Sequence, residues 1–158
     1  MSDDMSARLS RIRESATLLN ELCDQGAESV RALEEFLANV CSVGVECQVN
    51  VWSEEEFDED GYAYRCDSCE LCYGRFGSKF RVFLKWTSSD NQRGGDETKA
   101  WTECKREDKL KSLPLIEDLV DAIEESLEAR VKKAQQAISL VQHLTSTSGK
   151  KGGSDAQK

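Results

Sequence analysis

Residues 71–86 read LCYGRFGSKFRVFLKW, and this stretch decides the fold. Two apolar-rich runs flank Gly77 and Ser78, a pair of residues typical of a tight hairpin turn. The second run repeats with period two, as a strand with one buried face does, because Phe80, Val82, Leu84 and Trp86 alternate with Arg81, Phe83 and Lys85. The stretch therefore predicts two antiparallel strands joined at the glycine.

A second hairpin is predicted upstream. Residues 43–51 alternate valine or Cys47 with polar residues, which predicts another strand with one buried face. Asp60 and Gly61 separate the acidic extension of this strand from an aromatic run at residues 62–64. Asp-Gly between two strand-like runs is a strong signal of a tight hairpin turn.

Residues 87–98 consist of turn formers and charges, and they predict a loop before a short apolar-polar run at residues 99–102. Together with the two hairpins, this run predicts an antiparallel β-meander of about four strands.

Helices are predicted before the sheet. Residues 2–23 carry a seam of apolar side chains at alternating steps of four and three, the spacing of a coiled coil. Gly26 is predicted to end this helix, and residues 27–40 repeat helical spacing as a second, shorter helix. The seam consists of Met5, Leu9, Ile12, Ala16, Leu19 and Cys23.

Helices are also predicted after the sheet. Thr102 can cap a helix that runs to about Lys111, and Pro114 suits the first turn of a second one, so a break is expected at Leu113. The last helix continues a seam through four heptads, with Arg130 interrupting it. This seam consists of Ile116, Val120, Ile123, Leu127, Ala134, Ala137, Val141 and Leu144.

The predicted fold class is α+β, with the meander flanked by N-terminal helices and a long C-terminal helix. Residues 1–144 are predicted to form a single domain. Residues 145–158 contain almost no large apolar side chains and are predicted to form a disordered tail. The first and last helices, roughly 33 and 45 Å long, exceed what a small sheet can cover. They are predicted to pack on each other, or the last helix to form a homodimer with its copy.

The chain carries 30 acidic and 21 basic residues, a net charge of -9, which disfavours direct contact with nucleic acid or anionic lipid. It shows neither the apolar core of a signal peptide nor an apolar run near the roughly 18 residues that span a membrane. Seven cysteines in such a chain favour free thiols over a disulfide framework. These observations predict a cytoplasmic protein without a membrane partner.

Three cysteines form two overlapping CxxC units at Cys66, Cys69 and Cys72, a spacing that can present thiolates to zinc or to an iron-sulfur cluster. Cys104 is the best distant fourth ligand. Two observations count against a metal, because the remaining cysteines form no further CxxC unit and Cys69 and Cys72 would face opposite sides of a regular strand. The prediction is therefore no cofactor, with a zinc or iron-sulfur module as the alternative.

The acidic run at residues 54–60 matches the ligand spacing of a calcium-binding loop only in part, and its flanks resemble strands. It is predicted to be a solvated hairpin tip, and its side chains are a candidate binding surface for a partner with a basic site. The candidate residues are Glu54, Glu55, Glu56 and Asp58.

No nucleotide fingerprint, nucleophile elbow or metalloprotease motif occurs in the chain. A thiol enzyme is disfavoured because Asp67 and Glu70 would raise the pKa of the neighbouring cysteines. The predicted function is therefore a non-enzymatic protein-protein interaction or regulatory protein of the adaptor or inhibitor kind. Candidate anchors are Trp52, Phe83 and Trp101, which fall off the apolar stripes; the alternative is that these rings cover a second core face.

Overall fold

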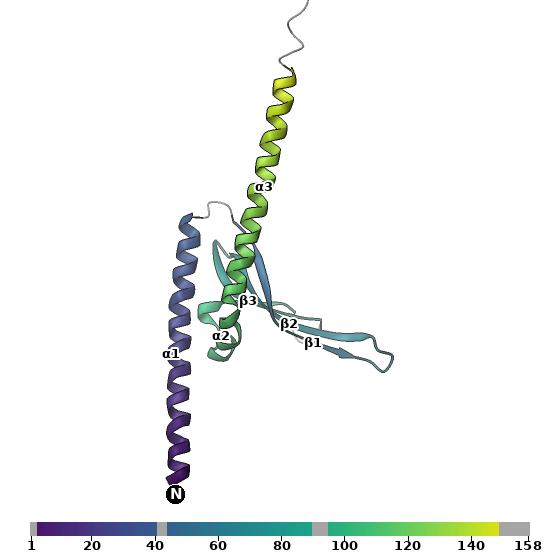
Figure 1. Ribbon diagram of the computed structural model, residues 1–158. Helices are drawn as coiled ribbons and strands as arrows, with labels where there is room; N and C mark the ends of the chain where they lie inside the picture. Colours follow the sequence, from purple (N-terminus) through teal and green to yellow (C-terminus); the bar gives the residue numbers. More distant parts are fainter. Residues whose placement is uncertain (1–2, 41–43, 90–94, 149–158) are drawn as a thin grey trace, which may run out of the picture. The chain divides into compact units, whose positions relative to one another are not determined.

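The structure is a computed structural model that describes residues 3–40, 44–89 and 95–148. Its contacts divide the chain into a first unit, Met1–Ile123, and a second unit, Glu124–Lys158. The elements, labelled in Figure 1, are α1 (Asp3–Val40), β1 (Cys47–Phe57), β2 (Ala63–Phe76), β3 (Lys79–Ser88), β4 (Glu97–Ala100), the 3-10 helix η1 (Trp101–Glu103), α2 (Arg106–Ser112), the 3-10 helix η2 (Leu113–Leu115) and α3 (Ile116–Ser148). The predicted α+β class is confirmed.

The four strands form one antiparallel sheet in the order β1-β2-β3-β4, so the predicted meander is confirmed. Both predicted hairpin turns are present. Gly61 and Gly77 occupy them with φ angles of 81° and 65°, in the left-handed region that favours glycine.

One face of the sheet supplies much of the core. Leu71 lies opposite Leu84, and Tyr73 lies opposite Val82, so the four side chains share a face. All four are buried. The period-two pattern that predicted β3 therefore identified the buried face correctly.

The N-terminal region differs from the prediction, because α1 is one continuous helix and Gly26 does not end it. A Cβ atom at position 26 would lie 2.7 Å from a methyl group of Leu113 and 3.5 Å from the Trp101 ring. Glycine costs a helix interior about 1 kcal/mol relative to alanine. Here its missing side chain lets η1 and η2 approach the helix closely, and that packing offsets the cost.

The elements after β4 follow the prediction with shifted boundaries. The apolar-polar run begins as β4 and continues as η1, and α2 starts only at Arg106. The break expected at Leu113 is present as η2, which contains Pro114. The last helix reaches Ser148 and so includes the first four residues of the predicted tail, and residues 149–158 lie outside the described residues.

The largest fully buried side chain is Trp101, with 0% of its surface exposed. Its indole Nε1 donates a hydrogen bond of 2.8 Å to Oγ of Ser112, which is also buried. The ammonium group of Lys109 lies 5.8 Å from the ring centroid. The ring therefore ties the segment after β4 to α2.

We expect Ser112→Ala to destabilise the protein by about 1–3 kcal/mol, because it leaves the buried indole N–H of Trp101 without an acceptor. Urea denaturation followed by circular dichroism would measure the change in unfolding free energy. Ser10→Ala removes an exposed helical serine and serves as the control, with an expected effect within about 0.5 kcal/mol. Equal effects of the two substitutions would contradict the structural role of this hydrogen bond.

Candidate functional site

The seam predicted at residues 5–23 continues in the same heptad frame to the end of α1, through Gly26, Val30, Leu33, Leu37 and Val40. The two halves of this seam differ in how far their side chains are buried. In the C-terminal half Cys23, Val30 and Leu37 are buried. In the N-terminal half the side chains stay exposed, as for Ile12 with 63% of its surface. We call residues 5–19 of this seam the open seam; its large members are Met5, Leu9, Ile12 and Leu19.

The covered half of α1 packs against β3, η1 and α2. Arg106 of α2 marks the boundary between the halves, because its guanidinium hydrogen-bonds Asn20 and pairs with Asp24 at 3.5 Å. The open seam lies N-terminal to this boundary, and Figure 1 shows that part of α1 (dark purple) running on beyond the sheet of its unit. The stripe that the protein covers at Cys23, Val30 and Leu37 therefore continues uncovered toward the N-terminus.

Basic side chains flank the open seam. Arg8 and Arg13 occupy the g and e positions of the heptad frame, and both are exposed. These positions face the flanks of a partner helix, where opposite charges stabilise the pair and like charges destabilise it. Arg8 and Arg13 thus give both flanks of the open seam a positive charge.

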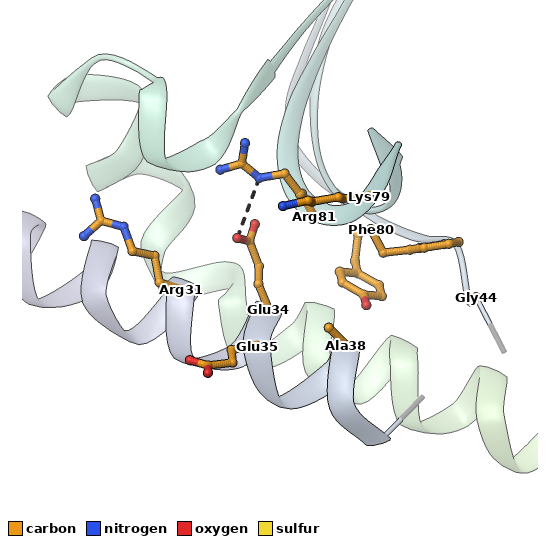
Figure 2. A pocket seen from close by; sticks show the side chains of 9 residues that line it. Arg31, Glu34, Glu35, Ala38, Gly44, Lys79, Phe80 and Arg81 are labelled. Carbon is orange, nitrogen blue, oxygen red and sulfur yellow. Dashed lines mark ion pairs between the residues drawn. The ribbon is translucent and has the colours of Figure 1, made fainter. Parts of the chain in front are cut away.

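A second feature is a cavity of about 760 Å³ between the C-terminal part of α1 and the β2–β3 hairpin. Tyr73 and Phe80 contribute two neighbouring rings to its wall, with centroids 6.0 Å apart and planes tilted by 39°. Gly44 lies close against the ring of Phe80, because a Cβ atom at position 44 would lie 2.0 Å from the ring atom Cζ. Figure 2 shows Glu34 reaching toward Arg81, with Arg31 and Glu35 of the same helix also among the residues that line the cavity.

Glu34, which lines this cavity, links α1 to strand β3. Its Oε1 accepts a hydrogen bond of 2.7 Å from the backbone N–H of Val82, on the part of β3 that β4 does not reach. Its Oε2 lies 3.7 Å from Nε of Arg81, and its side chain is only 14% exposed. The carboxylate therefore replaces the missing neighbouring strand and attaches α1 to the sheet.

We expect Glu34→Ala to lower the unfolding free energy by about 1–3 kcal/mol, because the N–H of Val82 loses its acceptor and Arg81 keeps only Glu103 as a counter-charge among the described residues. Glu34→Gln keeps an acceptor oxygen and should lose less. Chemical denaturation would measure both variants, with Glu35→Ala, on the exposed side of the same helix turn, as the control. An effect of Glu34→Ala no larger than that of Glu35→Ala would contradict this role.

The structure does not bring the four predicted metal ligands together. Cys66 is exposed, whereas Cys69, Cys72 and Cys104 are buried. Cys69 pairs with Trp86 on one face of the sheet and Cys72 with Phe83 on the other, as their odd spacing predicts. Among the described residues, no group of three or more histidine, cysteine, aspartate or glutamate side chains is arranged to hold a metal ion. These observations do not support a site of four cysteines, and metal binding by them stays an untested prediction.

The buried thiols lie in surroundings that suppress ionisation. Burial, followed by the carboxylate of Asp108, raises the pKa of Cys69 to about 12. Burial also raises the pKa of Cys104 to about 11, with Asp108 again adding to the effect. Burial and the carboxylate of Glu70 raise the pKa of Cys72 to about 11. Because the thiolate is the nucleophile, these side chains are poorly suited to thiol chemistry near neutral pH.

We expect iodoacetamide at about pH 8 to modify Cys66 in the folded protein much faster than Cys69, Cys72 or Cys104, which are buried and protonated. Peptide mass spectrometry over a time course would give the four rates. In urea the rates should converge, because the raised pKa values of the buried thiols depend on the fold. A buried cysteine that reacts as fast as Cys66 in the folded protein would show a reactive thiol instead.

The three candidate aromatic anchors occupy different environments. Trp52 and Phe83 are half-buried. The expectation that Trp101 is available to a partner is wrong, because η1 turns its ring into the core. The alternative weighed for these rings, that they cover a core face, thus holds for Trp101.

The acidic candidates lie on a two-stranded arm. β3 ends opposite Asp67, so β1 and β2 continue past it paired only with each other, which Figure 1 shows clearly. Glu54, Glu55, Glu56 and Asp58 are all exposed on this arm. Glu56 is the most constrained, since it accepts a hydrogen bond of 2.7 Å from the hydroxyl of Tyr64 and pairs with Arg65 at 3.2 Å.

Sequence reasoning missed Glu34 and the cavity, because both depend on the packing of α1 against β3. It found the open seam from heptad spacing, although spacing alone could not tell the covered half from the exposed half.

No protein-family model matches this chain, and neither the curated proteins nor the solved structures contain a significant match to it. Within the described residues, no helix combines the length and the apolar character that crossing a membrane requires.

Proposed function

We propose that this chain is a non-enzymatic protein-protein interaction protein that docks an amphipathic helix of a partner along the open seam of α1. One observation carries the proposal: the stripe is buried at Cys23, Val30 and Leu37, whereas its members before Cys23 are exposed. Exposed large apolar side chains that follow one stripe mark an interaction surface more strongly than the same side chains scattered singly.

The apolar surface of the open seam is of a size that suits a reversible complex. Burying a leucine or isoleucine side chain contributes about 1.5–3 kcal/mol, and the seam offers Met5, Leu9, Ile12 and Leu19. Association itself costs roughly 4–15 kcal/mol in lost freedom of motion and ordering. The difference supports a reversible complex and not a permanent one.

The flanking charges favour a foreign helix over a second α1. In a parallel pair of α1 helices, Arg8 of one copy would face Arg13 of the other, and like charges at these positions repel. A partner with glutamate or aspartate at the facing positions would form ion pairs there instead.

The proposal gives the acidic arm a supporting role as a second contact for a basic surface on the partner, together with the half-buried rings of Trp52 on the edge strand β1 and Phe83 on the inner strand β3. It also includes a cytoplasmic location, because the six described cysteines are free thiols.

Site-specific photocrosslinking in cells that naturally express the full chain would test this function. A benzophenone side chain at Ile12, on the open seam, should give a defined heteromeric adduct. The same probe at Ala7, an exposed f position of the same helix, should not. Leu9→Asp should abolish the adduct from position 12, because a carboxylate would have to be buried against the partner's apolar stripe.

Circular dichroism of Leu9→Asp would serve as the folding control, and we expect it to match the parent, since Leu9 is exposed. Equal adducts from positions 12 and 7, or an adduct that survives Leu9→Asp, would overturn the proposal. So would an adduct from position 12 that contains only a second copy of this chain.

A further inference from the structure

The second unit is described from Glu124 to Ser148 as the continuation of α3, and it lacks the cover that an amphipathic helix needs. Every side chain from Glu128 to Ser146 is exposed. Helices in proteins owe most of their stability to packing of an apolar face and are marginal without it. This helix therefore requires a partner along its apolar side.

A regular stripe of apolar side chains begins at the half-buried Leu127 and continues through exposed residues, while the exposed Leu140 and Leu144 lie beside it. Leu127, Val131, Ala134, Ile138 and Val141 follow one another at steps of four, three, four and three. The exposed fractions of Val131, Ile138 and Val141 are 56%, 57% and 58%. The stripe bypasses Arg130, because two successive steps of four at Ile123, Leu127 and Val131 shift the heptad frame.

The residue types in this frame fit a parallel two-stranded coiled coil. Val131 and Ile138 take the a positions, where β-branched residues combined with leucine at d, as at Leu127, favour two parallel strands. The d positions hold Leu127, Ala134 and Val141. The small Ala134 layer lets the two helices approach closely in the middle of the seam.

The flanking positions also permit self-pairing. In a parallel pair, Arg130 at g faces Gln135 at e of the other copy, and Ala137 faces Gln142. Neither pair brings like charges together. This distinguishes the stripe from the open seam of α1, where self-pairing would oppose two arginines.

We propose that residues 127–145 of α3 pair in parallel with the same residues of a second copy of this chain, over a length of about 27 Å. The pairing uses a helix and a partner different from those of the proposed function, so either can fail without the other. It makes the protein a dimer with two open seams.

Analytical ultracentrifugation of the full chain over a concentration series, with native mass spectrometry for the subunit number, would test the pairing. We expect a monomer-dimer equilibrium that Ile138→Asp weakens at least tenfold, because a buried carboxylate replaces an apolar a residue. Ser139→Asp places the same charge one residue away, off the stripe, and should leave the dimer largely intact. Ile12→Asp on α1 should also leave it intact.

The orientation has its own test in a Cys66→Ser background, which removes the one exposed thiol among the described cysteines. Ala134→Cys should form a symmetric disulfide on mild oxidation, because identical d residues meet only in a parallel, in-register pair. A monomer at all concentrations, a trimer or tetramer, or a dimer that is insensitive to Ile138→Asp would overturn the proposal. A dimer without the disulfide would overturn its parallel orientation.

Discussion

The indole of Trp101 is buried where α1, the end of the sheet and α2 meet. It lies against Gly26, which leaves room for the ring, and its N–H is satisfied by Ser112. Because η1 follows β4 directly, this contact fixes how the strands are joined to the helical elements of the first unit. Glu34 makes the complementary attachment on β3. The contacts of Trp101 and Glu34 hold the C-terminal half of α1 against the sheet and α2. The open seam is the part of α1 that lies N-terminal to these contacts.

Local sequence patterns predict the elements that depend only on neighbouring residues, and they do not predict features that depend on tertiary packing. The strands near residues 47–57 and 79–88 and the turns at Gly61 and Gly77 follow from period-two alternation and from residues that accept a positive φ. The continuity of α1 through Gly26 could not be predicted, because its cause is a packing contact with residues about 75–90 positions later in the chain.

The candidate site shows the same limit. Heptad spacing located the seam of α1, but only tertiary packing decides which of its members are covered. The choice of Trp101 as an anchor was wrong because the turn from β4 into η1 reverses the alternation expected for a strand. The opposite facing of Cys69 and Cys72 was predictable, since it follows from the two-residue period of a strand alone.

The acidic arm also bears on how the protein behaves when concentrated. β1 is an edge strand, and along the arm its outer backbone groups are open to pairing with another chain. Edge-to-edge pairing of two such strands would bring Glu54, Glu55 and Glu56 of one copy close to those of another. Charged side chains on an edge are a common means by which sheet proteins avoid aggregation. The same carboxylates would therefore keep the sheet from growing beyond its own four strands into intermolecular fibres.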